Sequence, residues 1–249
     1  MLLVGDIGNT ETKICLVSLN KKIIKKITFS SKNINNFQLK KKFKKFKLKN
    51  LPLEKCLFCS VVPITFKRIK KYIASYTKTN CLELKDLEIN KLIKIKVNKK
   101  QIGSDRLANA IGSMNNKDNF IILDFGTATT FDVLIKNVYY GGIISPGIQL
   151  SLSTLINNAS LIPNLNLKKI DKVIGSNTIN AVRSGFFWGY AGLIDNIVDL
   201  IMKETKKKFK VIITGGFSKL FTNSLRSKVI IDKDITIKGL IRTVRLNDF

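Results

Sequence analysis

Residues 2–10 read LLVGDIGNT and residues 120–127 read FIILDFGT, and this repeated stretch decides the fold. In each copy an apolar run with strand character ends in an aspartate, Asp6 or Asp124, which is followed by glycine and a polar residue. A second strand-like segment follows each copy after a short turn. Because the same unit occurs twice, we predict two half-molecules of similar topology.

Strand patterns alternate with helical patterns along the rest of the chain. An amphipathic helix is predicted around residues 35–47, and Pro63 is suited to open another helix. A long helical pattern covers residues 177–206, before a strand over 211–214. The sequence therefore predicts an α/β protein with mixed sheets flanked by helices.

The polar run at residues 115–119 is the best candidate for a domain boundary. We therefore expect an N-terminal lobe over residues 1–117 and a C-terminal lobe over residues 118–249.

Composition excludes several classes of chemistry. The 249 residues contain no His, which rules out Ser-His-Asp and Cys-His catalysis and HExxH zinc sites. Acid–base chemistry would then fall mainly to carboxylates. No apolar run approaches the roughly 20 residues of a membrane span, and Asp6 interrupts the first apolar run without a preceding basic region. We expect a soluble protein of the cytoplasm, without a membrane segment.

The cysteines form one CxxC pair, Cys56 and Cys59, within an apolar run. A structural zinc site would need two more ligands, which His cannot supply. We expect buried, chemically inert thiols on a strand.

The net charge of +27 allows two interpretations. The lysine-rich run at residues 40–47 has the charge of a nucleic-acid site. However, the basic residues are mostly Lys and rarely the Arg that base and phosphate recognition favours. Leu39, Phe43 and Phe46 also have helical spacing, so we favour a surface helix with a solvated lysine face and do not expect nucleic-acid binding.

Both Asp-x-Gly turns have the chemistry of phosphate sites. Glycine allows the backbone to turn tightly, so that amides can face phosphate oxygens, and an aspartate offers a hard oxygen to a cation. Lys13 would place its ammonium over the same phosphates. We infer two phosphate-facing hairpins, although each turn alone could belong to an ordinary sheet.

Asp105 lies near a predicted helix start, between Gly103 and Arg106. It could cap the helix or pair locally with a cation. It could equally accept a hydroxyl proton while nearby positive charge holds phosphates or a carboxylate. The spacing does not decide between these roles.

Three glycines, Gly185, Gly189 and Gly192, recur at helical spacing in the long helical stretch. This pattern indicates close packing of that helix against a neighbouring element or a second subunit.

Together these motifs resemble type III pantothenate kinases, which belong to the superfamily of actin, hexokinase and acetate kinase. The resemblance spans nearly the whole chain and rests on the order and spacing of several short motifs. These are Asp6-Ile7-Gly8-Asn9-Thr10 with Lys13, Ser60-Val61-Val62-Pro63, Gly103-Ser104-Asp105-Arg106, Asp124-Phe125-Gly126-Thr127-Ala128-Thr129-Thr130 with Asp132, Gly141-Gly142-Ile143-Ile144-Ser145-Pro146-Gly147, Gly175 with Thr178 and Ala181, and Gly215-Gly216.

The resemblance implies the duplicated actin-like ATPase (ribonuclease H-like) fold. It also implies a kinase that transfers the γ-phosphoryl group of ATP to pantothenate, the first step of coenzyme A biosynthesis. Its cofactors would be Mg²⁺ and a monovalent cation, K⁺ or NH₄⁺. Members of this family are homodimers.

The resemblance also implies roles for individual residues. Asp105 would be the catalytic base, Asp124 would bind the monovalent cation, and Asp6 would hold Mg²⁺ directly or through water. ATP would be bound by Asp6, Ile7, Gly8, Asn9, Thr10, Glu11, Thr12, Lys13 and Thr127. Pantothenate would be bound by Gly103, Ser104, Asp105, Arg106 and Thr178, with Thr178 completing the partner's pocket.

The chain departs from the family pattern at two places. Lys96 and Lys99 stand where the family has Tyr and Pro, and the segment at residues 158–163 is altered. Two alternatives stay open: a non-catalytic nucleic-acid-binding or regulatory protein on the same fold, and a kinase for a different small hydroxyl compound.

Overall fold

The computed structural model describes residues 1–32, 34–48 and 51–246. The chain divides into two compact units. Unit 1 comprises the described parts of residues 1–114, 137–139 and 234–246, and unit 2 comprises residues 115–136 and 140–233. The units do not follow the predicted linear division at residue 117, because the chain returns to unit 1 after residue 233.

The sheet of unit 1 has the strand order β3-β2-β1-β4-β5. Its central strand β1 pairs antiparallel with β2 and parallel with β4. The strands are β1 (Leu2–Ile7), β2 (Glu11–Val17), β3 (Ile23–Ser30), β4 (Lys55–Ser60) and β5 (Cys81–Glu83). This arrangement brings the predicted turn after β1 to the edge where β4 also ends.

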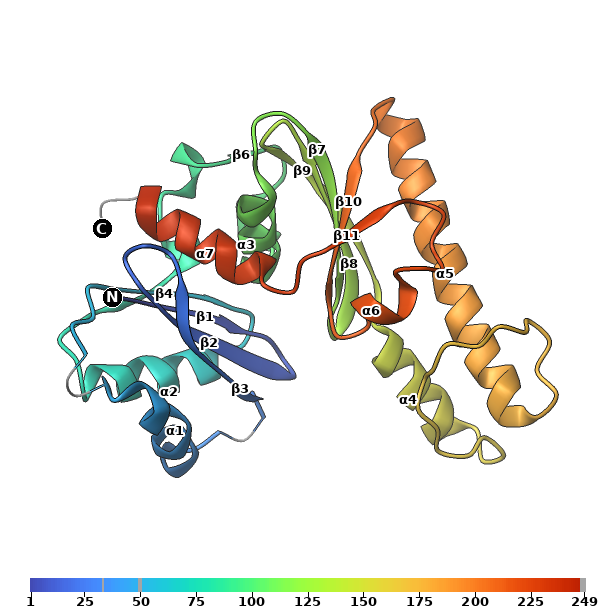
Figure 1. Cartoon of the computed structure of the whole chain (residues 1–249), viewed down its shortest axis with the longest axis horizontal. Coiled ribbons are helices and arrows are strands. Elements are labelled where there is room, and N and C mark those ends of the chain that lie inside the picture. Colours follow the sequence, from blue (N-terminus) through green and yellow to red (C-terminus); the bar gives the residue numbers. More distant parts are fainter. Residues whose placement is uncertain (33, 49–50, 247–249) are drawn as a thin grey trace. The chain divides into compact units, whose positions relative to one another are not determined.

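Helices cover both faces of this sheet (Figure 1). On one face, α1 (Asn36–Phe43) and α2 (Pro63–Ala74) enclose a core that includes Leu39, Phe43 and Ile69. On the opposite face, α3 (Ser104–Ser113) and α7 (Ile235–Leu246) pack against each other and contact β4 and β1. The segments that link β5 to α3 are η3 (Leu84–Asp86), η4 (Ile89–Lys91), β6 (Lys94–Ile95) and η5 (Lys99–Gln101).

The second sheet has the strand order β11-β10-β7-β8-β9-β6, in which the five strands β9-β8-β7-β10-β11 repeat the order of unit 1. The central strand β7 pairs antiparallel with β8 and parallel with β10, as β1 does with β2 and β4. The strands are β7 (Asn119–Phe125), β8 (Ala128–Ile135), β9 (Val138–Pro146), β10 (Lys210–Gly215) and β11 (Val229–Ile231). The α/β class and the internal duplication are thereby confirmed.

One long helix, α5 (Thr178–Thr205), dominates the helical layer of unit 2 (Figure 1). Its buried residues, among them Phe187 and Ile194, form a core with β7, β8 and β10. The shorter helices α4 (Ile148–Asn158) and α6 (Ser218–Phe221) add Ile148 and Phe221 to that core.

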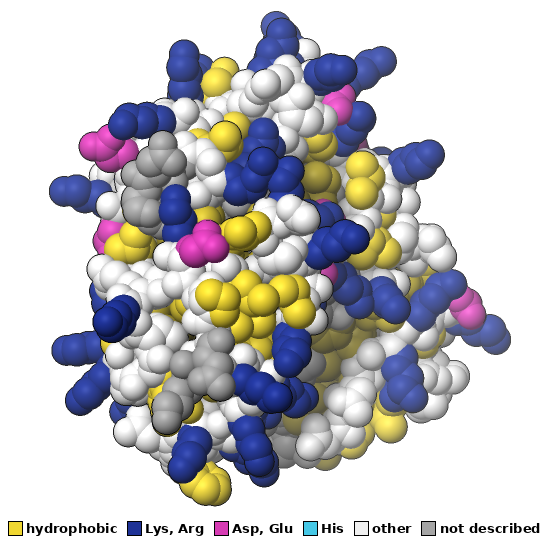
Figure 2. Space-filling view, turned by 60° about the vertical axis from the view of Figure 1, so that its left-hand side comes forward, with side chains coloured by type: hydrophobic (Ala, Val, Ile, Leu, Met, Phe, Trp, Pro, Cys, Tyr) yellow, Lys and Arg dark blue, Asp and Glu magenta, His cyan; other side chains and the backbone are white. Residues whose placement is uncertain are grey.

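The lysine run at residues 40–47 forms a solvated face, as predicted. Leu39, Phe43 and Phe46 are buried, while the lysines between them are exposed. Figure 2 shows Lys and Arg side chains spread over the face in view rather than gathered into one patch. All four cysteines are free and buried, which confirms the predicted burial of Cys56 and Cys59.

No helix within the described residues is both long enough and apolar enough to cross a membrane.

Candidate functional site

The first predicted phosphate loop is the turn between β1 and β2. Asp6 lies near the end of β1 and is half-buried, and the Gly8 amide closes the turn by donating to the Glu11 carbonyl oxygen at 3.0 Å. Asn9, Thr10 and Glu11 are exposed at its tip. The loop therefore presents polar groups beside the half-buried carboxylate of Asp6, as a phosphate and cation site requires.

Cross-strand pairing places three side chains on one face of the sheet. Asp6 lies opposite Lys13 on β2 and opposite Cys59 on β4. Directly opposed residues project to the same face. Accordingly, the Cys59 thiol donates to Asp6 Oδ1 at 3.5 Å.

Lys13 also faces a carboxylate that the sequence analysis missed. Its ammonium lies 3.8 Å from Oδ1 of Asp234, which precedes α7, and Lys26 contacts the same oxygen at 2.6 Å. Burial opposes ionisation of Asp234, but the hydrogen bond from Lys26 and the charges of Lys26 and Lys13 lower its pKa overall. Asp234 therefore holds the predicted phosphate-binding lysine from the side of α7.

The Gly103–Arg106 motif forms the N-terminus of α3, as predicted. Gly103 is the N-cap residue, and Asp105 Oδ1 accepts a hydrogen bond from the Arg106 amide at 2.8 Å. Burial raises the pKa of Asp105, and the hydrogen bond and charge of Arg106 oppose this rise. A carboxyl whose pKa is raised by burial has the property expected of a general base.

Cys59 lies within electrostatic reach of both predicted acidic residues. Burial raises the pKa of its thiol, and the charges of Asp6 and Asp105 raise it further. The structure of unit 1 thus brings the phosphate loop and the predicted base to one site on the face covered by α3 and α7.

The second predicted phosphate loop, in unit 2, is built in the same way. The Gly126 amide donates to the Ala128 carbonyl oxygen at 3.1 Å, and Asp124 is half-buried near the end of β7. Gly215 has a φ of +84°, and a Cβ added there would lie 2.7 Å from Asp124 Oδ1. Only glycine suits that conformation and that proximity, so the end of β10 approaches the Asp124 carboxylate closely.

Thr127 is exposed at the tip of this second turn. Gly147, the N-cap residue of α4, packs so closely beneath it that an added Cβ would overlap the Thr127 carbonyl. Thr178 is the exposed first residue of α5, and Gly175 packs against the Ala181 amide in the same turn. The structure therefore places the predicted residues in two groups, one in each unit.

Comparison with known proteins decides the family. A family model described as type III pantothenate kinase matches residues 2–200. The type III pantothenate kinase of Pelagibacter ubique (strain HTCC1062) is 65% identical over 246 residues, which cover 99% of each chain. The chain belongs to the type III pantothenate kinase family.

Solved structures at low identity agree on the fold. A Campylobacter jejuni protein named as a conserved Baf family transcriptional activator matches with a TM-score of 0.62 at 18% identity, covering 98% of this chain and 97% of that one. A glucokinase from an Antarctic psychrotroph matches with a TM-score of 0.51 at 10% identity and 99% coverage of both chains. These neighbours confirm the predicted fold.

The residues of the Asp6 turn fit the Mg²⁺ ion that this kinase family implies. Within the described residues, no three His, Cys, Asp or Glu side chains gather as a self-contained metal site. Mg²⁺ in kinases is commonly held by one or two carboxylates together with substrate phosphates and water. The single half-buried carboxylate of Asp6, beside the turn amides, is suited to such a shared site.

The departure from the family at Lys99 has a local structural account. Asn98 Oδ1 accepts a hydrogen bond from the Lys100 amide at 3.0 Å, so a side-chain cap closes the η5 turn without proline. Lys99 Nζ donates to the Leu87 carbonyl oxygen at 3.1 Å. The ammonium of Lys99 is therefore directed towards the segment between η3 and η4.

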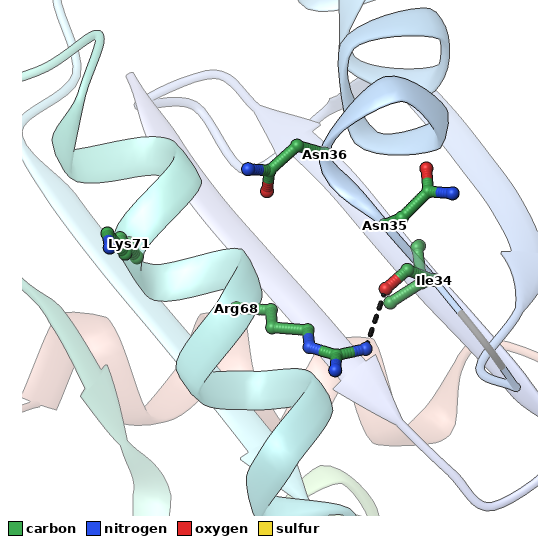
Figure 3. Close-up of a pocket in the computed structure, with 5 residues that line it drawn as sticks. All are labelled: Ile34, Asn35, Asn36, Arg68 and Lys71. Carbon is green, nitrogen blue, oxygen red and sulfur yellow. Dashed lines mark hydrogen bonds between the residues drawn. The ribbon is translucent and has the colours of Figure 1, made fainter.

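The structure also has a surface cavity apart from the pantothenate kinase motifs. It measures about 520 Å³ and is lined by Ile34, Asn35, Asn36, Arg68 and Lys71, between the start of α1 and the middle of α2 (Figure 3). Arg68 Nη1 donates to the Ile34 carbonyl oxygen at 2.9 Å. None of these residues belongs to the predicted site.

Sequence reasoning missed two acidic residues of unit 1, Asp234 and Glu83. Glu83 ends β5 and accepts hydrogen bonds from the Ser60 and Lys85 amides and from the Ser104 hydroxyl. The sequence carries a weak signal for it, a carboxylate between two leucines in a strand-like segment.

Proposed function

We propose that the chain transfers the γ-phosphoryl group of ATP to the primary hydroxyl of pantothenate, with Asp105 as the catalytic base. The observation that carries this proposal is the site in unit 1. There a carboxyl with a burial-raised pKa begins α3 on the same face of the sheet as the Asp6 turn. Membership of the family supplies the substrates.

In the proposed reaction, the hydroxyl proton passes to a carboxylate oxygen of Asp105. The hydroxyl oxygen bonds to the γ-phosphorus, and the bond from that phosphorus to the β,γ-bridging oxygen breaks, which releases ADP. Arg106 is suited to hold the pantothenate carboxylate, because its guanidinium can donate two parallel hydrogen bonds. Gly103 and Ser104 would contact the same substrate at the start of α3.

The polar turn from Asp6 to Lys13 would hold the ATP phosphates. Its exposed tip and the Lys13 ammonium would offset the charge that develops on the departing ADP. Mg²⁺ held by Asp6, directly or through water, would supply further charge neutralisation. In unit 2, Thr127 would contact ATP and Asp124 would hold a monovalent cation.

A coupled ADP-release assay with ATP, Mg²⁺ and pantothenate tests the reaction, once with K⁺ and once with Na⁺ alone. We expect pantothenate-dependent turnover with K⁺ and a collapse of turnover without it. ADP release that does not depend on pantothenate would contradict the substrate assignment. Equal turnover in both buffers would contradict the cation role of Asp124.

We also propose that the chain forms a homodimer through α5 and acts in the cytoplasm. Gly185, Gly189 and Gly192 are exposed on α5, and a Cβ added at any of them would meet nothing within 4 Å. Within the described residues, the predicted packing of these glycines against a neighbour is therefore not satisfied. A smooth exposed face of this kind suits a second copy of α5, and Thr178 would then complete the partner's pocket.

Gly189→Arg should convert the dimer into a monomer, because a long charged side chain would separate the two α5 helices. Light scattering after size exclusion measures the mass directly. Ala74→Arg, at an exposed position on α2, adds the same side chain away from α5 and should leave the dimer intact. A Gly189→Arg protein with unchanged dimeric mass would contradict this interface.

A further inference from the structure

Glu83 joins three separate segments of unit 1 through one carboxylate. Oε1 accepts a hydrogen bond from the Ser60 amide at 3.2 Å and another from the Ser104 hydroxyl. Oε2 accepts a bond from the Lys85 amide at 2.6 Å. The segments are the end of β4, the η3 turn and the start of α3.

Each of these segments adjoins the proposed site. Ser60 follows Cys59, which contacts Asp6, and Ser104 precedes Asp105 in α3. Ser104 is itself buried, so its hydroxyl has a fixed environment. Glu83 is therefore linked to the neighbours of Asp6 and Asp105, although it belongs to neither motif.

The carboxylate of Glu83 lies in an environment that disfavours its ionised form. Burial raises the pKa of Glu83, and the hydrogen bonds from Ser104, Lys85 and Ser60 counteract this rise. Burying an ionised carboxylate costs free energy unless its oxygens accept hydrogen bonds. Here both oxygens of Glu83 accept hydrogen bonds from the surrounding segments. The arrangement suits a fixed acceptor better than a proton donor.

We infer that Glu83 is a positioning residue that fixes the start of α3, and with it Ser104, Asp105 and Arg106, against the end of β4. This inference rests on the proposed function of Asp105. Small displacements of a base from its substrate reduce the reaction rate strongly, since a shift of about 1 Å can lower it on the order of 100-fold.

The first test compares Glu83→Gln with the wild type in the ADP-release assay. An amide cannot accept through both of its heavy atoms, so at least one of the three accepted bonds is lost. We expect kcat/KM for pantothenate to fall by about 10-fold or more. KM for ATP should stay within about twofold, because the three hydrogen bonds that Glu83 accepts come from Ser60, Lys85 and Ser104, outside the Asp6–Lys13 turn.

Glu88→Gln is the matched control, because its carboxylate is exposed and pairs only locally with Lys91 at 3.1 Å. It should keep wild-type kinetics. A Glu83→Gln protein with unchanged kcat/KM for pantothenate would overturn the inference. Equal losses towards ATP and pantothenate would also overturn it, since they would indicate general damage to unit 1.

A double-mutant cycle with Ser104→Ala separates positioning from general structural support. The second variant of this cycle is Glu83→Ala, which removes the Ser104 bond together with the other two. If Glu83 acts through Ser104, the losses from Glu83→Ala and Ser104→Ala should be clearly less than additive, because both changes remove the same hydrogen bond. Fully additive losses would show that the two residues act independently and would overturn the proposed link.

A titration independent of activity distinguishes failure of this inference from failure of the proposed reaction. The carboxyl carbon resonance of Glu83, followed by NMR against pH, should report a higher pKa in Ser104→Ala than in the wild type. The sign follows because the Ser104 hydrogen bond lowers the pKa of Glu83. An unchanged pKa would overturn the link even if Glu83→Gln did not fold, whereas absent wild-type turnover would count against the proposed function alone.

Discussion

Asp105→Asn should reduce kcat by about 100- to 10,000-fold while leaving the fold intact, because an amide cannot accept the hydroxyl proton. The side chain keeps its shape, and an amide oxygen can still accept the bond from the Arg106 amide. Circular dichroism and melting temperature should therefore match the wild type. The ADP-release assay measures the loss, and near-normal turnover would refute the assignment of Asp105 as base.

Glu54→Gln is a matched control for the loss of one carboxylate in unit 1. Glu54 is exposed and pairs with the N-terminal ammonium at 3.1 Å. It lies beside the start of β1, whereas Asp6 lies near the end of that strand. Its removal should leave turnover unchanged.

The pH dependence of activity gives a second test of Asp105 as the catalytic base. Burial raises its pKa, and the base must be ionised to accept a proton, so activity should rise with pH through a value above the ordinary range of aspartate. The acid limb of kcat/KM should therefore be displaced upwards. An acid limb at or below the ordinary aspartate range would contradict the burial of this carboxyl.

Gly239→Val should destabilise unit 1 by about 3 kcal/mol, because α3 and α7 cross where neither helix has room for a side chain. A Cβ at Gly239 would overlap the Ala108 carbonyl and lie 3.1 Å from the Gly112 amide nitrogen. A Cβ at Gly112 would overlap the Ile235 carbonyl. Valine would separate the helices, and activity should fall as well because α3 carries Asp105.

Urea denaturation measures this loss through the transition midpoint. Arg245→Val places the same β-branched side chain at an exposed position of α7, where only helix propensity changes, so it should cost less than about 1 kcal/mol. Equal stability of the two variants would contradict the prediction that the close approach of α3 and α7 leaves no room for a side chain at Gly239.

The local signals in the sequence predicted the central parts of both units. The apolar runs that end in Asp6 and Asp124 form β1 and β7, and the Gly103 motif begins α3. The lysine run forms a solvated helix face, because Leu39 and Phe43 have helical spacing. These features depend on neighbours within a few residues, so alternation and turn chemistry were sufficient.

The limits of prediction appear where residues far apart in the sequence meet. The return of α7 to unit 1 brings Asp234 to Lys13 and Gly239 to Ala108, and no local pattern specifies that crossover. The bond between Glu83 and Ser104 likewise requires β5 to end beside the start of α3. The sequence by itself determined the two Asp-x-Gly hairpins, the helix that carries Asp105 and the lysine surface. Only the tertiary structure decided which carboxylates support them, because the pairing of distant segments depends on strand order and helix packing rather than on local spacing.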